Sequence, residues 1–438
     1  MDEEQATMSF IETPGPVMVP ELAKRGLRQR LRVHTDAYPR SIWALSAAVL
    51  TVWTGRGMVL PFLVIYFSQI AGIRASVVGA VIAGSGLAGI AFVLIVAGQI
   101  DKRGGRPVLL ATLSMISLAT LLIAWANSTP AFLAVSLLLY CASQSYWPSI
   151  DTVVTSLADA GKVIPAMALI RVAMAVGIGL GGLLGGIMVA GGGLSEYRLL
   201  FGASAALIAL GAVIVWRVVP SVPLQTTSDS GAQGTWGDVL ADRTFLYGML
   251  VLFALVLGFT QLNMSVPPFL RAEAGIGEGR IGALFFMNTI LIVLTQVPIA
   301  ARVDRGNVGR LLSVASLIWG AAFLAMIATP GFAAAAIFVF LAFTGGELIF
   351  MPITAIIAVR LAPLHLRGRY FSLLSITWGG SWAIATLTAG IALDLSRPVL
   401  LWPVMAAFMV VGAVAAWRLR SIERLTPPVI AQTGTADG

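Results

Sequence analysis

The sequence predicts an all-α, polytopic membrane protein with twelve transmembrane helices in two pseudo-symmetric six-helix bundles. Only 11% of the 438 residues are charged, whereas soluble domains carry about 25%. The mean hydropathy is +0.91. Apolar runs recur from residue 42 to residue 418, and many reach the length of about 20 residues that crosses a bilayer. The second half of the chain also repeats features of the first half, which predicts two bundles of the same kind.

Short polar connections divide the apolar region into twelve predicted spans. Several spans are longer than about 20 residues, which is compatible with tilted helices or helix ends that protrude from the bilayer. The predicted spans are 42–70, 76–99, 107–127, 130–157, 164–190, 197–219, 244–270, 280–301, 309–328, 331–359, 367–393 and 397–418.

The longest connection, residues 220–243, is rich in Ser, Thr, Gly and Asp, and it separates the first six spans from the last six. We therefore expect five segments along the chain. These are a basic N-terminal tail (1–41), an N-terminal six-helix bundle (42–219), a linker (220–243), a C-terminal six-helix bundle (244–418) and a C-terminal tail (419–438).

The basic residues predict the orientation of the chain in the membrane. Most of the 28 lysines and arginines lie in the two tails and in alternate connections, if residues at helix ends are counted with the adjoining connection. Because cytoplasmic connections carry the excess of Lys and Arg, both termini and the linker are expected to be cytoplasmic. This distribution accounts for the net charge of +8. The expected partner of the basic residues is therefore the lipid bilayer, and no nucleic acid is expected as a partner.

Several classes of function lack their motifs in this chain. There is no Gly-Lys-Ser/Thr phosphate loop, and no Ser, His and Asp lie at one membrane depth. The single cysteine, Cys141, excludes a disulfide within the chain. Both histidines, His34 and His365, lie in polar flanks, away from Cys141. We therefore expect no metal site, no cofactor and no enzymatic activity.

A dense cluster of charges lies between the second and third spans, in the segment AGQIDKRGGRP (97–107). A related segment, AARVDRGNVGR (300–310), lies between the eighth and ninth spans. Segments 146–177 and 350–381 also align with each other. Two halves that share such features are typical of secondary transporters.

In these segments the chain resembles the major facilitator superfamily, whose signature turn reads roughly G-x-L-A-D-R-x-G-R-R. Asp101, Lys102, Gly104 and Arg106 match its Asp, first basic residue, Gly and last basic residue. Gly105 stands where the family has the middle Arg. The resemblance covers residues 42–418 and implies alternating access by two rocking bundles.

The resemblance further implies a cytoplasmic latch, which joins the two halves when the cavity faces outward. Opposite charges in partly dry surroundings can bias a two-state equilibrium in this way. The alternative is that the basic residues only set the topology. The residues assigned to the latch are Asp101, Lys102, Arg106, Asp151, Asp304, Arg305, Arg310, Arg367 and Arg369.

A glycine-rich segment in the fifth span resembles the motif G-x-x-x-G-P-x-x-G-G of drug:proton antiporters. Gly177, Gly181, Gly185 and Gly186 match it, and Gly182 stands where the Pro belongs. Small residues permit close approach of a neighbouring helix. The resemblance implies a monomeric exporter of a small amphipathic organic compound, driven by the proton gradient, in the inner membrane of a bacterium. The alternatives are a proton-coupled importer and an exporter of a sugar or metabolite.

Glu347 and Arg56 are the candidates for coupling to protons. Glu347 lies near the middle of the tenth span, where an ionised carboxylate is costly and the protonated form is favoured. Alternatively, it is permanently neutralised by hydrogen bonds or an arginine. Arg56 lies about 20 Å into the first span, and either Glu347 or an anionic group of the substrate is its expected partner. For Arg171, nearer the cytoplasmic face, the sequence favours snorkelling to the interface.

Polar and aromatic side chains within the spans are candidates for lining a substrate cavity. Such side chains normally face protein or water rather than lipid, and helix packing is the alternative role for each. The candidates are Gln144, Tyr146, Trp147, Gln261, Asn263, Asn288, Trp378 and Trp382.

Overall fold

The computed structural model describes residues 39–158, 162–220, 236–303, 306–361 and 367–421. These residues form helices and the connections between them, with no strand in the described part of the chain. In chain order the elements are α3 (Arg40–Val59), α4 (Leu63–Ile65), η1 (Tyr66–Ile70), α5 (Ala75–Arg103), α6 (Gly105–Ile123), α7 (Thr129–Leu157), α8 (Val163–Met188), α9 (Leu194–Val218), α10 (Trp236–Ala241), α11 (Arg243–Met264), α12 (Val266–Ala272), α13 (Glu278–Val303), α14 (Val308–Met326), α15 (Ala335–Leu361), α16 (Arg367–Leu393), η4 (Pro398–Leu400), α17 (Leu401–Arg418) and η5 (Leu419–Ser421).

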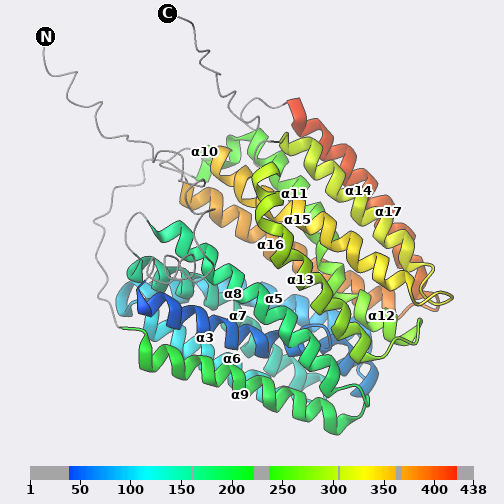
Figure 1. Ribbon diagram of the computed structural model, residues 1–438, viewed down its shortest axis with the longest axis horizontal. Coiled ribbons are helices and arrows are strands. Elements are labelled where there is room, and N and C mark those ends of the chain that lie inside the picture. Colours follow the sequence, from blue (N-terminus) through cyan, green and yellow to red (C-terminus); the bar gives the residue numbers. More distant parts are fainter. Residues whose placement is uncertain (1–38, 159–161, 221–235, 304–305, 362–366, 422–438) are drawn as a thin grey trace, which may run out of the picture.

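The helices fall into two bundles with the same pattern of packing (Figure 1). In the first half, α3 packs against α8, α5 against α7, and α6 against α7 and α9. In the second half, α11 packs against α16, α13 against α15, and α14 against α15 and α17. Each of these contacts of the first half thus has its counterpart six spans later, and the predicted pseudo-symmetry is present in the helix packing.

In the part of the chain that the structure describes, eleven helical segments are long and apolar enough to cross a membrane. The fourth predicted span, α7, is not among them although it has 29 residues. Its second half reads SQSYWPSIDTVVTS, and these polar side chains lower its hydropathy. It nevertheless packs against both α5 and α6, so it completes the first bundle.

The first helix of each half is interrupted at proline. The helix that begins at Arg40 ends at Val59, and the chain becomes helical again at Leu63, beyond Pro61. In the second half, α11 ends at Met264 and α12 begins two residues later, with Pro267 in its first turn. Proline lacks the N–H that would continue the helical hydrogen bonds, so the sequence explains both interruptions.

The two halves meet at the end of the bundle opposite residue 40. There α5 packs against α16, and α8 packs against α13. One continuous apolar cluster joins the halves at this end, and it contains Phe67 and Val78 of the first half and Phe269 of the second. The core around Leu45 in the first half forms a cluster of its own. The contact between the halves is therefore polarised toward one end of the molecule.

Glycines bring α8 close to a helix on each of two faces. A Cβ added at Gly177 would lie 2.8 Å from the Leu50 carbonyl oxygen of α3, and Gly181 and Gly185 face the same helix. A Cβ added at Gly186 would lie 2.6 Å from the Glu278 carbonyl oxygen of α13 in the other half. Three glycines of the segment thus pack within the first bundle, and the fourth packs between the bundles.

Replacing Gly181 by alanine is expected to destabilise the protein. The new methyl group would press on the Thr54 carbonyl oxygen, and overpacking of this kind costs about 1–3 kcal/mol. Thermal unfolding of the purified protein in detergent should therefore show a lower midpoint for Gly181→Ala. The matched control is Gly202→Ala in α9, where an added Cβ meets nothing within 4 Å and the midpoint should not fall. An equal fall in both variants would show that close packing on α3 is not the cause.

Candidate functional site

Glu347 lies in the interior of α15 and is held by a short polar chain from the neighbouring helix. The Asn288 side-chain amide of α13 donates hydrogen bonds to Glu347 Oε2 at 3.3 Å and to Thr344 Oγ1 at 2.8 Å. Glu347 is half-buried, and no ion pair of Glu347 occurs among the described residues. The structure therefore brings together two of the residues that the sequence predicts, a carboxyl group and an amide, without a neutralising cation in the described part of the chain.

Arg56 lies in the last turn of α3, just before the interruption at Pro61. One of its terminal nitrogens donates a hydrogen bond to Ser143 Oγ at 3.2 Å, and its guanidinium lies over the Trp53 ring at 4.6 Å. The helix end provides about 1 kcal/mol to a cation, whereas a charge at mid-membrane costs about 3 kcal/mol. Among the described residues no carboxylate pairs with Arg56, so its partial compensation comes from a hydroxyl, a ring and the helix end.

Aromatic rings connect Arg56 with a second arginine. Trp53 and Trp147 have ring centroids 5.6 Å apart, and Arg171 lies over Trp147 at 4.2 Å. The Trp53 indole N–H donates a hydrogen bond to the Tyr146 hydroxyl at 3.1 Å. Arg171 therefore has a defined stacking partner in the neighbouring helix, which the snorkelling interpretation did not include.

Asp151 pairs with Arg171 in the same half of the molecule. The Arg171–Asp151 distance is 3.9 Å, and the two side chains are 49% and 45% exposed. A pair this long and this exposed contributes little to stability. Among the described residues, the partner of Asp151 is thus a residue of the fifth span; the side chains of Arg367 and Arg369, with which the resemblance associates it, lie outside the described residues.

The other candidates for the cavity have different positions. Gln144 lies between the halves, with its Nε2 3.8 Å from a Cβ added at Gly379. Trp378 and Trp382 are partly exposed. Gln261 is fully buried, donates to the Ala385 carbonyl oxygen at 3.4 Å and accepts from Ser265 Oγ. Asn263 is also buried. The polar side chains of the seventh span are therefore buried between packed helices. The sequence did not predict this, because periodicity alone does not tell which face of a buried helix meets the cavity.

Two residues assigned to the latch contact helices of their own half. The Arg106 guanidinium donates to the Trp216 carbonyl oxygen in the last turn of α9 at 2.6 Å. Arg310, at the corresponding position of the second half, lies over the Trp417 ring of α17 at 5.9 Å. Lys102 is exposed. Asp304 and Arg305 lie outside the described residues, as do the side chains of Asp101, Arg367 and Arg369, so the latch between the halves stays a prediction.

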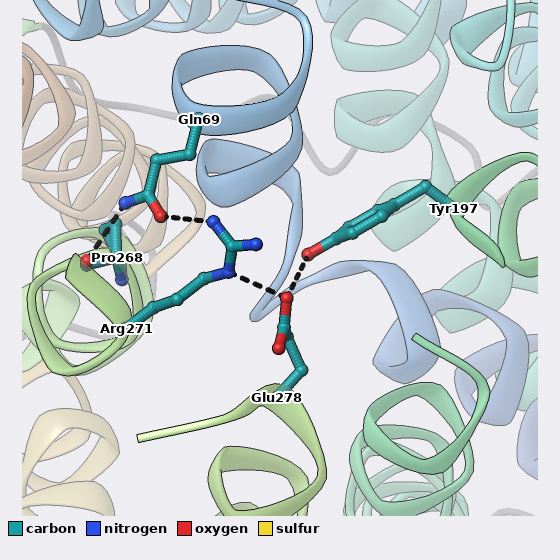
Figure 2. Close-up of polar contacts among 5 residues, drawn as sticks. All are labelled: Gln69, Tyr197, Pro268, Arg271 and Glu278. Carbon is teal, nitrogen blue, oxygen red and sulfur yellow. Dashed lines mark hydrogen bonds and ion pairs between the residues drawn. The ribbon is translucent and has the colours of Figure 1, made fainter. Parts of the chain in front are cut away.

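A polar network joins the halves at the end where they meet (Figure 2). Arg271 pairs with Glu278 at 2.7 Å within the second half, and it also donates to Gln69 Oε1 of the first half at 2.8 Å. Gln69 in turn donates to the Pro268 carbonyl oxygen at 3.0 Å. Tyr197 of the first half donates to Glu278 Oε1 at 3.3 Å. Since Glu278 is only 4% exposed, separation of the halves here would leave a buried carboxylate with fewer donors.

Asp394, just beyond the end of α16, caps the first turn of α5 in the other half. Its carboxylate oxygens accept hydrogen bonds from the backbone N–H groups of Ala75 at 3.0 Å and Ser76 at 2.8 Å. An anion at a helix N-terminus is favourable because the first N–H groups lack partners within the helix. Partial burial alone would raise the pKa of Asp394, but the bonds from Ser76 and Ala75 and the nearby Arg74 hold that pKa below its ordinary value of 3.8.

The network at this end was not predicted from the sequence. Gln69, Arg271, Glu278 and Asp394 lie at helix ends or in connections, where charged and polar residues are common. A weak signal was present, because Arg271 and Glu278 are opposite charges on the two sides of one short connection. Nothing in the sequence connects them with Gln69, which is about 200 residues away.

Two related helical bundles, closed against each other at one end and carrying charged side chains within their helices, define a polytopic secondary transporter. The sequence profile of the Major Facilitator Superfamily matches residues 45–275, more than half of the chain. The protein therefore belongs to the major facilitator superfamily. The membership predicted from the sequence is confirmed, and the resemblance to drug:proton antiporters stays a prediction.

Known relatives are distant but extend over nearly the same length. The chain is 23% identical over 393 residues to the uncharacterised MFS-type transporter YdeE of Escherichia coli (strain K12), covering 87% of this chain and 94% of that protein. The crystal structure of the nucleoside transporter NupG has a TM-score of 0.67 at 15% identity, covering 87% and 99% of the two chains. That of a D-xylose–proton symporter has a TM-score of 0.69 at 12% identity, covering 86% and 97%. At these identities the likeness to solved structures concerns the fold.

Replacing Arg271 by glutamine is expected to open the end at which the halves meet. The variant loses the charged hydrogen bond from Arg271 to Gln69 across the halves; such a bond is worth on the order of 2 kcal/mol, which shifts the closed–open equilibrium by about thirtyfold. Spin labels at Ser195→Cys and Glu273→Cys, in a Cys141→Ser background, report the distance between the halves there. Arg271→Gln should add a population at longer distance, and Arg280→Gln, which changes an exposed arginine of the same region, should not. Identical distance distributions in all proteins would exclude the network as a gate.

The contact through Asp394 is expected to be sensitive only to acid. Because its pKa is lowered in the closed structure, the carboxylate contributes its full stabilisation above the ordinary value of 3.8 and loses it as the pH falls through the lowered value. The same label pair should therefore report no opening between about pH 5 and 8 from this residue. Asp394→Asn should shift the distance distribution at neutral pH, and its additional effect should vanish in strong acid. Opening of the unchanged protein near neutral pH that Asp394→Asn removes would contradict this assignment.

Proposed function

We propose that this protein moves a small amphipathic organic compound across the inner membrane of a bacterium, coupled to protons through Glu347. Alternating access of the two bundles carries the compound. The observation that supports proton coupling is the position of Glu347, a half-buried carboxyl in mid-helix with an amide partner and no cation beside it in the described residues. A group that is costly to keep ionised and still reachable from a cavity can take up and release a proton.

Export in exchange for protons is the direction that the glycine segment of α8 supports, through its resemblance to drug:proton antiporters. With both termini in the cytoplasm, as the basic residues indicate, the end at which the halves meet faces outward. The structure then corresponds to a state closed to the outside. An exporter in this state binds its substrate from the cytoplasm, and opening of the Gln69–Arg271 contact belongs to its release step.

Import together with protons is the second candidate, and Arg56 favours it. A cation in mid-membrane without a carboxylate partner among the described residues suits an anionic substrate. Binding of an anion near a carboxyl group favours the protonated carboxyl, so the anion and the proton would move in the same direction. The two candidates differ in the sign of the coupled pH change.

Proton coupling is tested with the purified protein in liposomes that contain the pH indicator pyranine. Dyes, antibiotics and sugars are added outside, without a pre-imposed gradient. Exchange with protons raises the lumenal pH, and co-transport with protons lowers it. We expect a pH change with at least one amphipathic compound and its reduction to background in Glu347→Gln, because an amide cannot carry the proton.

The matched control is Glu273→Gln, which makes the same chemical change at an exposed glutamate in the connection after α12. It should keep the pH signal of the unchanged protein. Transport of the compound with a full pH signal in Glu347→Gln would assign proton coupling to another group. Compound flux without any pH change in the unchanged protein would overturn proton coupling altogether.

A further inference from the structure

Two arginines and two tryptophans of the first bundle form a continuous stack, which we call the arginine–tryptophan stack: Arg56, Trp53, Trp147 and Arg171. The successive contacts are 4.6 Å, 5.6 Å and 4.2 Å between group centres. The stack uses helices α3, α7 and α8, and α8 is also one of the helices that contact the second half. Nothing in the fold requires two guanidiniums here, since ordinary apolar side chains would pack the same helices.

The stack borders a cleft with an aromatic wall and charged groups at one end. The cleft is narrow: its enclosed volume is about 10 Å³, room for about one water molecule, and it opens to solvent. Trp53, Tyr146 and Trp147 line it, and Asp151 and Arg171 lie at its rim. Because the Trp53 indole is fixed by its hydrogen bond to Tyr146, the aromatic surface is held in place. A planar ring system is the natural occupant of such a wall.

The two guanidiniums of the stack, of which Arg171 lines the cleft and Arg56 lies on the other tryptophan, have few polar partners among the described residues. A guanidinium has five N–H donors, and the described residues give Arg56 one hydrogen bond, to Ser143. Among the described residues, the polar contact of Arg171 is the 3.9 Å pair with Asp151, which is longer than a charge-assisted hydrogen bond. Glu347 does not supply the missing charge in the described structure, since it lies in the second half, accepts a hydrogen bond from Asn288 of the same half and forms no ion pair among the described residues. A ligand carboxylate could therefore bind to either arginine without displacing a strong contact.

We infer that the arginine–tryptophan stack binds an aromatic organic anion, with its ring against Trp53 and Trp147 and its carboxylate on the guanidiniums that flank them. This inference rests on the proposed function, because it names the substrate class of the same transporter. Asp151 acts on this site as a competitor, since its carboxylate occupies Arg171 in the absence of ligand.

Calorimetric titration of the full-length protein in detergent at neutral pH tests the inference with three probes of one ring skeleton. 2-Naphthoate is the anion, 2-naphthylmethanol is neutral and 2-naphthylmethylammonium is the cation. We expect 2-naphthoate to bind at least about tenfold more tightly than either analogue, and Arg56→Gln or Arg171→Gln to remove about tenfold of this affinity. Asp151→Asn should leave the affinity for 2-naphthoate unchanged or raise it, whereas a purely structural role for the Arg171–Asp151 pair would lower it.

Arg217→Gln is the matched control, because Arg217 also stacks on a tryptophan at 4.6 Å but lies exposed at the end of α9. It should bind all three probes as the unchanged protein does. Equal affinity for the three probes, no binding of 2-naphthoate, or unchanged binding in both Arg56→Gln and Arg171→Gln would overturn the inference. Size-exclusion profiles and thermal midpoints confirm that the variants are folded.

The outcome is separable from that of the proposed function. Loss of the Glu347-dependent pH signal leaves the titration of 2-naphthoate unaffected, so the anion site would stand without proton coupling. Conversely, a Glu347-dependent pH signal with neutral or cationic compounds, together with no selectivity for 2-naphthoate, would retain proton-coupled transport and exclude the anion site.

Discussion

The cost of a charge in the hydrocarbon core is the constraint on which the rest of this structure depends. A single ionised side chain at mid-membrane costs about 3 kcal/mol even on permissive scales, so each charge within the bundles needs compensating contacts. Glu347 has Asn288, Arg56 has Ser143 and Trp53, and Arg171 has Trp147 and Asp151. These contacts are weaker than buried ion pairs, and this is why we propose these groups as the sites for ligands and protons.

Small residues determine where the bundles are rigid and where they can move. Helices in lipid gain little from apolar burial against each other, so close backbone packing takes its place. On α8, Gly177, Gly181 and Gly185 lie against α3 of the same half, and Gly186 lies against α13 of the other half. A rocking motion can change the second contact while the first one persists, because the two sets of glycines lie on different faces of one helix.

Much of the fold was predictable from the sequence, because hydropathy, proline and basic residues act locally. Pro61 and Pro267 explain the two helix interruptions. The sequence similarity of the two halves reappears as a repeated pattern of helix contacts. The depth of Glu347 was also readable from the sequence. The side-chain contacts between helices could not be read from the sequence, because the sequence gives the depth of a residue in the membrane but not the direction in which its side chain points. The bonds from Asn288 to Glu347 and from Arg271 to Gln69 depend on the rotation of each helix about its axis. Gln261 lies at the depth expected for a cavity residue, but its helix is rotated so that this side chain is buried against α16.

The two bundles share a backbone plan and differ in their charges, and this difference bears on coupling. The first bundle carries arginines in its interior, and the second carries Glu347. In the proposed mechanism, an anion held by Arg56 or Arg171 adds negative charge near Glu347, which favours the protonated carboxyl. A neutral or cationic compound has no such effect, and a cation favours the ionised form. The charge of the ligand and the direction of the proton are therefore linked through the same carboxyl group. An anionic substrate argues for co-transport with protons, and a cationic substrate argues for exchange with protons. This holds whichever direction of transport the glycine segment of α8 suggests.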